Sequence, residues 1–358
     1  MRRWYAAVLA LLLPAGCAAE PMAAVPTLDG QPPIVIAHRG ASGERPEHTL
    51  ASYELAIEQG ADFIEPDLVL TKDGVLVARH ENEISETTDV ADRPEFADRK
   101  ATRRIDGKDV TGWFTEDFTL AELKTLRAKE RIPRLRGTAN DGKFEVPTFE
   151  EILDLLARVN MERTHPVGVY PETKHPGYFA AIGLPHEAPL LALLEKYGYR
   201  GRTAPVFIQS FEVGNLKAIR AKSDLPLIQL MDDEGGPADD PRTSYAAMAS
   251  PAGLKAVAAY ADGIGPNKAM VIPRGALGTL GDPTSLVRDA HAAGLKVHPW
   301  TFRRENYFLP LGDKSGINPA GHGDLAAEIA AYLATGIDGL FSDNPREAVP
   351  AVKEGASR

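Results

Sequence analysis

The stretch "VIAHRGASGERPEHTL", residues 35–50, places a histidine and an arginine directly behind a short apolar run. The run predicts a buried β-strand, and polar side chains in such strands are usually paired or functional. His38 can exchange a proton near neutral pH, and Arg39 can bind an anionic oxygen. We therefore interpret this strand end as part of a site that handles protons and negative charge.

A second group of polar residues lies in "DFIEPDLVLTKDGVLVARHE". Glu65 and Asp67 are two residues apart on the predicted strand, so their carboxylates project from the same face. Asp73–Gly74 is typical of a two-residue hairpin, which would place Asp67 opposite His80. A slip of one residue would turn His80 to the other face of the sheet.

A third polar group ends the run "PVGVYPETK", where Glu172 and Lys174 share a face. Three carboxylates gathered at one mouth, where the ends of neighbouring strands meet, repel one another. A bound divalent cation would remove that repulsion. Oxygen ligands favour Ca²⁺, or Mg²⁺, over zinc. Positive side chains would then contact a phosphate, and the two histidines would act as acid and base. The side chains expected at this mouth are His38, Arg39, Glu65, Asp67, His80, Glu172 and Lys174.

The elements that must bring these residues together are eight short apolar runs that alternate with segments of helical periodicity. This alternation predicts βα units, and eight of them favour a closed (β/α)₈ TIM barrel over an open doubly wound sheet. We expect the barrel at residues 33–350. The runs are "PIVIAHR" from residue 33, "DFIEPDL" from 62, "PVGVYPETK" from 166, "APVFIQSF" from 204, "PLIQLM" from 226, "DGIGPN" from 262, "KVHPWTF" from 296 and "GLFSDNP" from 339.

Two segments are longer than βα loops require. Residues 81–146 form an expected insertion over the barrel mouth, with a short helix where Thr119 and Glu122 have capping-box spacing. We expect its charges to form a solvated face. Residues 231–253 follow the fifth strand and are expected to form another part of the rim.

Composition limits the possible partners. The chain has 358 residues, 44% of them hydrophobic and 25% charged, which is enough for a sizeable core. Its formal net charge of −10 makes nucleic acid and anionic membranes poor partners for the whole surface. Any anion site must therefore be a local basic pocket.

The first 16 residues have the pattern of an export signal, with a basic start and an apolar stretch too short to span a bilayer. Cys17, the only cysteine, follows "LPAG" as the acylated cysteine of a bacterial lipoprotein follows its lipobox. Pro14 departs from that pattern, and ordinary cleavage a few residues later is the alternative. We expect an exported protein, periplasmic or membrane-anchored through Cys17, with a linker at residues 17–32.

The region "AHRGASGERPEHTLASYELAIEQGADFIEPDLVLTKDGVLVARHE" resembles the signature of the glycerophosphodiester phosphodiesterases, specifically the long periplasmic type. "YPETK", "IQSF", "ADGIGP", "VHPWT" and "GLFSDNP" extend the resemblance from about residue 33 to 350. It implies metal-dependent release of sn-glycerol 3-phosphate and an alcohol from glycerophosphodiesters. It also implies metal ligands at Glu65, Asp67 and Glu172, catalytic histidines at His38 and His80, and phosphate contacts at Arg39 and Lys174.

Several points stay open at this stage. Either histidine could be the base, and either water or a hydroxyl of the substrate could attack first. A phospholipase acting on intact lipids, or a surface lipoprotein that binds a host protein, are alternative functions, although no particular partner protein is indicated. Other candidate site residues are weaker. They are Gln209, His298 and Trp300 for the glycerol pocket, His48 for the first loop, and Trp113 and Phe114 for a substrate approach, whereas His165, His175, His186, His291 and His322 are interpreted as surface residues.

Overall fold

The structure is a computed structural model that describes residues 25–356. The expected export signal and Cys17 lie outside these residues. Within the part described, no helix is both long and apolar enough to cross a membrane.

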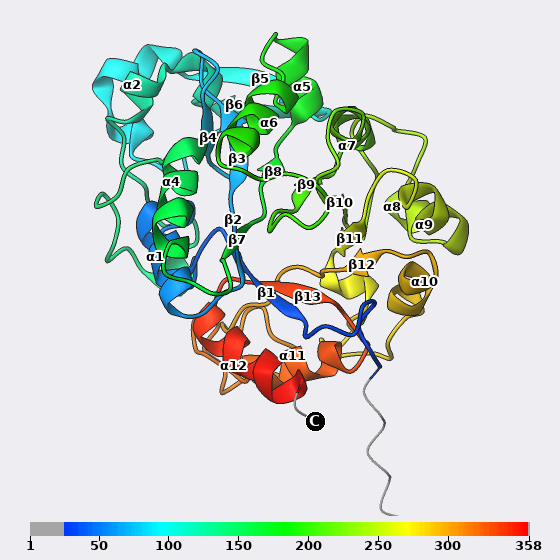
Figure 1. The fold of residues 1–358 in the computed structure, drawn as a ribbon. Helices are drawn as coiled ribbons and strands as arrows, with labels where there is room; N and C mark the ends of the chain where they lie inside the picture. Colours follow the sequence, from blue (N-terminus) through cyan, green and yellow to red (C-terminus); the bar gives the residue numbers. More distant parts are fainter. Residues whose placement is uncertain (1–24, 357–358) are drawn as a thin grey trace, which may run out of the picture.

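Eight strand positions form the centre of the molecule, and all eight predicted runs contribute one (Figure 1). The second and third runs are each divided in two at a proline, which lacks the N–H that a sheet needs. The strands are β1 (Ile34–His38), β2 (Phe63–Glu65) with β3 (Asp67–Leu70), β7 (Gly168–Val169) with β8 (Glu172–Thr173), β9 (Ile208–Ser210), β10 (Leu227–Met231), β11 (Gly263–Pro266), β12 (Lys296–Val297) and β13 (Gly339–Ser342).

The strands close into a ring. Parallel pairing runs β13-β1-β2-β7 in one sheet and β12-β11-β10-β9-β8-β3 in the other, and the divided strands join the two sheets. The remaining gap, between β12 and β13, is bridged by backbone hydrogen bonds from Asp338 N to Val297 O (3.0 Å) and from Phe341 N to Pro299 O (3.1 Å). The predicted barrel is therefore confirmed, and its parallel strands all end at one mouth.

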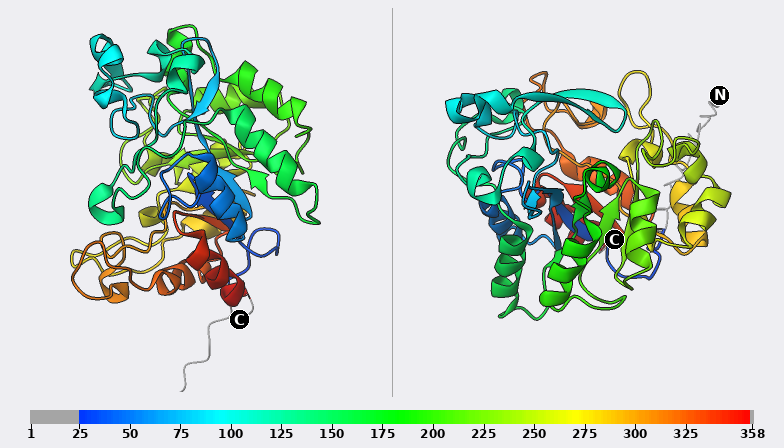
Figure 2. Two further views of the ribbon diagram at one scale, coloured as in Figure 1. Left: turned by 90° about the vertical axis from the view of Figure 1, so that its left-hand side faces the viewer. Right: turned by 90° about the horizontal axis from the view of Figure 1, so that it is seen from above.

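Helices surround the strands, and their starts follow the capping signals in the sequence (Figures 1 and 2). Thr49 accepts a hydrogen bond from Ser52 N, and Thr148 forms both bonds of a capping box with Glu151. The helices outside the first insertion are α1 (Leu50–Glu58), α4 (Phe149–Asn160), α5 (Pro176–Ala181), α6 (Glu187–Lys196), α7 (Val213–Arg220), α8 (Tyr245–Met248), α9 (Pro251–Val257), α10 (Leu286–Ala292), α11 (Leu325–Leu333) and α12 (Pro345–Ala356).

The insertion at residues 81–146 builds a separate lobe on the mouth side of the barrel (Figure 2). It contains the hairpin of β5 (Ala101–Ile105) and β6 (Lys108–Gly112), and the short helices α2 (Leu120–Leu123) and α3 (Pro133–Arg136). The expected helix is α2, whose capping box forms both of its hydrogen bonds.

The expected register of the hairpin before this lobe is wrong by one residue. β4 (Leu76–Ala78) pairs with β3 so that Leu68 lies opposite Ala78. The turn contains three residues rather than two, and Gly74 adopts the left-handed conformation at φ 77°. A three-residue loop with a left-handed residue is the next most common hairpin connection, and the Asp-Gly pair does not distinguish it from the shorter one.

Arg79, and not His80, therefore lies beside Asp67, and its N–H donates to the Asp67 carbonyl at 3.0 Å. His80 belongs to the loop that follows β4, because that strand ends at Ala78. Loop conformation, rather than strand alternation, decides where its imidazole points.

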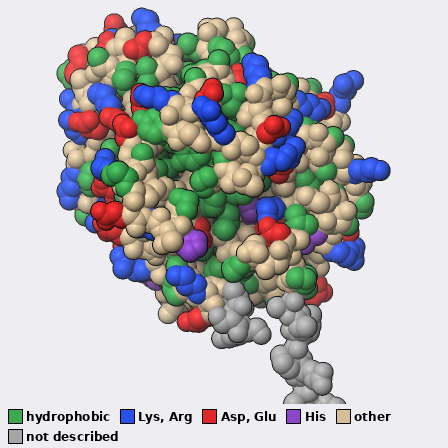
Figure 3. Space-filling view, in the orientation of Figure 1, with side chains coloured by type: hydrophobic (Ala, Val, Ile, Leu, Met, Phe, Trp, Pro, Cys, Tyr) green, Lys and Arg blue, Asp and Glu red, His purple; other side chains and the backbone are tan. Residues whose placement is uncertain are grey.

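The surface carries charges of both signs. Figure 3 shows lysine and arginine side chains interspersed with aspartate and glutamate on the face drawn. No single continuous basic area covers the face drawn.

Candidate active site

A cavity of about 320 Å³ lies at the mouth of the barrel. Six of the seven residues expected at the mouth line it, together with Gln209 and Trp300, and the seventh, Asp67, is 1% exposed beneath it. Its lining consists of His38, Arg39, Glu65, His80, Glu172, Lys174, Gln209, Phe211, Leu230, Asp232, Trp300 and Phe341. Residues far apart in the sequence thus meet because parallel strands all deliver their carboxyl ends to one face.

Three buried carboxylates converge here. One oxygen from each of Glu65, Asp67 and Glu172 lies within 4.8 Å of the others. The strand registers produce this arrangement, since Asp67 is the direct neighbour of Glu172 in the β3–β8 pair. Burial raises the pKa of Glu65 well above its usual value, and the nearby Asp67 carboxylate raises it further. Burial also raises the pKa of Glu172, to about 8.

This group of side chains fits a hard divalent cation. The donors are all oxygen atoms, as Ca²⁺ and Mg²⁺ prefer. Gln209 donates its amide N–H to Glu65 at 3.1 Å, and its Oε1 atom is buried without a hydrogen-bond partner. A buried acceptor beside crowded carboxylates is an unfavourable arrangement that a cation would relieve.

Positive charge surrounds the carboxylates on two sides. Arg39 contacts Glu47 at 3.0 Å and Asp67 at 3.3 Å, and its Nε atom has no hydrogen-bond partner. Lys174 contacts Glu172 at 3.0 Å. Burial opposes the charge on both side chains, yet these neighbouring carboxylates raise the pKa of each above its usual value. Both cations therefore stay charged at the cavity wall.

The two histidines have matching surroundings. His38 Nδ1 lies 2.6 Å from Asp343, and His80 Nδ1 lies 3.0 Å from Glu81. A carboxylate at Nδ1 holds the proton on that nitrogen and leaves Nε2 free to exchange one. Burial lowers the pKa of His38 to about 4 and that of His80 to about 3, and Arg39 acts in the same direction on both.

Asp343, which sequence reasoning missed, belongs to this site. It accepts hydrogen bonds from Arg136 at 2.6 Å and from Arg303 at 2.7 Å, besides its contact with His38. Burial opposes its charge, but Arg303 and Arg136 hold the pKa of Asp343 well below its usual value. A usable signal was present, because Asp343 follows the apolar run "GLFS" as His38 follows "IVIA".

Arg136 corrects the expectation that the charges of the insertion form only a solvated face. It lies in α3 of the insertion, and its side chain is 5% exposed between Asp343 and Glu305. The insertion is thereby connected to the partner of His38.

We expect Asp343→Asn to lower kcat about 100-fold, at the lower end of the range for loss of one proton transfer, with little change in KM. Asparagine can present its NH₂ group to Nδ1, which would place the imidazole proton on Nε2. Steady-state kinetics will measure this split. Glu305→Gln is the matched control, since it removes the other carboxylate partner of Arg136 without touching His38. An equal loss of kcat in both variants would mean that Asp343 is merely structural.

The other histidines considered for the site, His48 and His298, lie in different surroundings. His48 bonds to Asp67 at 2.9 Å and so supports the site from behind. His298 instead hydrogen-bonds to Tyr170 and lines a hollow with Asp29 and Ile34, at the opposite end of the strands. It was wrongly placed near the glycerol pocket, because its backbone still pairs with β11 (His298 N to Ile264 O, 2.9 Å) and the chain continues past it before it reaches the mouth at Trp300.

Three of the five histidines interpreted as surface residues are not free on the surface. His186 is fully buried and bonds to the Leu68 carbonyl at 3.0 Å, while His291 pairs with Asp338 and His175 with Glu81. Packing buries His186, and ion pairs hold the two partly buried rings, which no local pattern indicates. His165 and His322 are exposed as expected.

The two aromatic residues expected near the substrate are packed inside the insertion. Trp113 donates its indole N–H to the Phe96 carbonyl, and Phe114 is fully buried with Arg103 over its ring. Neither lines the cavity.

The chain is similar in sequence to known proteins. Residues 38–347 match the model of the glycerophosphoryl diester phosphodiesterase family. A glycerophosphodiester phosphodiesterase of Arabidopsis thaliana, GDPD6, is 40% identical over 94% of this chain and 92% of its own length. The glycerophosphodiester phosphodiesterase of Haemophilus influenzae is 31% identical over 95% of both chains.

Solved structures share the fold. An Oleispira antarctica phosphodiesterase in complex with the product sn-glycerol 3-phosphate has a TM-score of 0.58 at 22% identity, over 91% of this chain and 99% of that one. A glycerophosphodiester phosphodiesterase from Agrobacterium tumefaciens has a TM-score of 0.54 at 21% identity, over 89% and 99%. From its family match and its relatives, the chain belongs to the glycerophosphoryl diester phosphodiesterase family.

Proposed function

We propose that this phosphodiesterase hydrolyses glycerophosphodiesters to sn-glycerol 3-phosphate and an alcohol, with a divalent cation, Ca²⁺ foremost, at Glu65, Asp67 and Glu172. The observation that carries the proposal is one cavity lined by carboxylates that can hold a metal, two cations and two histidines. A bound divalent cation supplies positive charge to phosphate oxygens and lowers the proton affinity of an oxygen that it coordinates.

Arg39 and Lys174 bind the phosphate. Each is buried and each shares its charge with a carboxylate, so a phosphate oxygen can add to an existing ion pair without displacing it. Gln209 and Trp300 line the same cavity beside the acids and contact the glycerol half. Held in this way, the scissile bond lies between the two imidazoles.

His38 and His80 move the protons. Before substrate binds, both rings are neutral at pH 7 because their pKa values lie well below 7. One Nε2 atom accepts the proton of the attacking oxygen. The negative charge of the bound diester raises the pKa of the ring that it contacts, and that ring can then deliver a proton to the departing alkoxide.

A substrate assay tests the proposal. Purified protein with calcium should release glycerol 3-phosphate from glycerophosphocholine or glycerophosphoethanolamine, and a chelator should stop the release. Product detection with a glycerol 3-phosphate dehydrogenase reports this directly. Absence of glycerol 3-phosphate from every diester and metal combination tried would overturn it.

A phospholipase acting on intact lipids is the second candidate, and exposed apolar side chains favour it. Leu277 is 80% exposed and Ile317 fully exposed on loops that follow β11 and β12. Phosphatidylcholine vesicles in the same assay distinguish the two, since faster headgroup release from vesicles than from glycerophosphocholine would favour the phospholipase.

Export and acylation at Cys17 are proposed on the sequence pattern alone. The lipobox-like "LPAG" supports them. Fractionation of the bacterial host should find the protein in membranes and the Cys17→Ser variant in the soluble fraction. Equal distribution of the two would exclude a lipid anchor at Cys17.

A further inference from the structure

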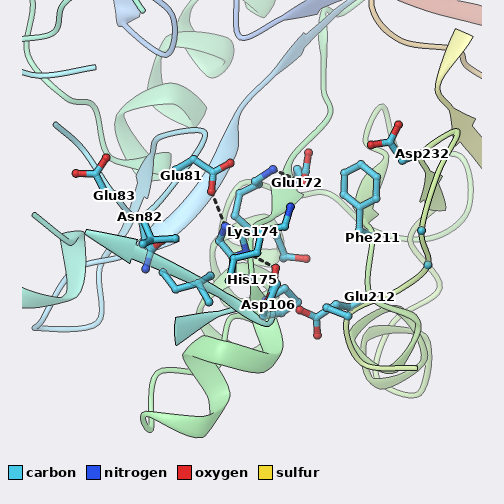
Figure 4. A pocket seen from close by; sticks show the side chains of 18 of the residues that line it. Glu81, Asn82, Glu83, Asp106, Glu172, Lys174, His175, Phe211, Glu212 and Asp232 are labelled. Atoms are coloured by element: carbon cyan, nitrogen blue, oxygen red, sulfur yellow. Dashed lines mark hydrogen bonds and ion pairs between the residues drawn. The ribbon is translucent and has the colours of Figure 1, made fainter. Parts of the chain in front are cut away.

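A second cavity, of about 660 Å³, adjoins the first, and Figure 4 shows side chains that line it. The two cavities share the lining residues Glu172, Lys174, Phe211 and Asp232. The insertion forms one wall, and the loops after β8, β9 and β10 form the others. A diester with its phosphate between the two imidazoles therefore has space for one of its two alcohol groups here.

The larger cavity has an excess of negative charge. Its lining includes the carboxylates of Glu81, Glu83, Asp106, Glu172, Glu212, Asp232 and Glu234, against the basic side chains of Lys108, Lys174 and His175. His175 is already shared between Glu81 at 2.7 Å and Asp106 at 2.5 Å, and Lys174 is engaged by Glu172 (Figure 4). Two of its three basic groups are thus neutralised by carboxylates of the same cavity.

Glu212 and Asp232 accept hydrogen bonds from backbone and amide N–H groups. Glu212 is 5% exposed and accepts hydrogen bonds from Gly177 N at 3.0 and 3.2 Å. Asp232 accepts from the Asn267 amide at 2.8 Å and from the N–H of Asp233. Neither forms an ion pair with a basic side chain in residues 25–356. Burial raises the pKa of Glu212 to about 7, and His175 opposes that shift only in part. A cation bound beside Glu212 would favour its charged form.

Two further features are independent of the acidic charge. Asn82 lines the cavity at 1% exposure, and its Oδ1 atom has no hydrogen-bond partner. Phe211 and Tyr245 present aromatic rings 6.1 Å apart, and Lys174 Nζ lies 5.8 Å from the Phe211 ring. A buried acceptor without a donor, aromatic rings and carboxylates without an ion-pair partner are all groups that can bind an ammonium group.

We propose that this cavity binds the alcohol half of the substrate and selects alcohols that carry an ammonium group, over neutral polyols. The inference rests on the proposed phosphodiesterase function and adds its substrate class. Glu212 and Asp232 supply the charge that distinguishes the two kinds of alcohol, and the ring face of Phe211 attracts the positive charge of the ammonium group.

The test compares kcat/KM for glycerophosphoethanolamine and glycerophosphoglycerol. Wild-type protein should prefer the cationic diester by about tenfold or more, the value of one partly desolvated charged contact. Glu212→Gln and Asp232→Asn should each reduce this ratio by a large part of that factor. Glu195→Gln is the matched control, because it removes an exposed carboxylate of α6 that does not line the cavity and should leave the ratio unchanged.

The possible results distinguish failure of this inference from failure of the proposed function. Hydrolysis of both diesters with equal kcat/KM in wild type, or a ratio unchanged in both cavity variants, overturns the inference and leaves the phosphodiesterase standing. Hydrolysis of neither diester overturns the proposed function and the inference with it. Calorimetric binding of both diesters to calcium-loaded His38→Ala measures the same preference without turnover.

Discussion

Replacement of His38 or His80 by alanine is expected to lower kcat for glycerophosphocholine at least 100-fold. Each proton transfer is typically worth about 10²- to 10⁴-fold in rate. Both imidazoles line the small cavity, and each has a carboxylate at Nδ1 that leaves Nε2 to exchange a proton. An unactivated alkoxide leaves poorly without a proton, so loss of the acid should be severe.

A change of leaving group will identify the acid. A diester of nitrophenol releases a weakly basic anion that needs no proton, so the variant lacking the acid should recover most of its rate on that substrate. The variant lacking the base should stay slow on both. His322→Ala is the control, since His322 is exposed and outside the cavity. Full activity of both site variants would eliminate the mechanism.

Removal of the metal is expected to have the second large effect. A chelator should lower kcat/KM at least about 100-fold, because charge stabilisation by a bound cation is worth several kcal/mol. Added calcium should restore activity and raise the Tm, since a ligand at 100 times its Kd stabilises the folded state by about 2.7 kcal/mol. Enzyme assays and thermal unfolding with and without calcium measure the two effects.

Glu65→Gln should change the Tm of the metal-free protein in the opposite direction from removal of calcium from wild type. Without a cation, the variant should have a higher Tm than wild type, because a buried carboxyl group that Asp67 and Glu172 repel has been replaced by a neutral amide. With calcium, the variant should gain little, having lost a ligand. Glu195→Gln should behave as wild type in both conditions. A calcium-dependent rise in Tm as large as that of wild type would show that Glu65 does not bind the metal.

Features that depend on neighbours in the sequence could be predicted without a structure. Apolar runs separated by helix-period segments gave the eight strands, and Thr148 with Glu151 formed the capping box that their spacing predicts. The two-residue spacing of Glu65 and Asp67 put both carboxylates on one side. Side-chain direction repeats with a short period in strands and helices, so the local sequence specifies it.

Loop conformations and contacts between residues distant in the sequence could not be predicted in the same way. The turn before β4 has three residues rather than two, which moved His80 out of the strand register. His186 is buried by the packing of helix and strand rather than by any pattern around it. In both cases the energy that decides the conformation comes from neighbours elsewhere in the fold.

By itself, the sequence determined that acids, cations and imidazoles would meet at the ends of parallel strands, because barrel strands all point the same way. Only the tertiary structure decided which of them touch. His38 pairs with Asp343, 305 residues away, when the last strand closes on the first, and Arg136 reaches the same carboxylate from the insertion. Contacts of this kind depend on the closure of the whole ring, which no segment of the chain encodes alone.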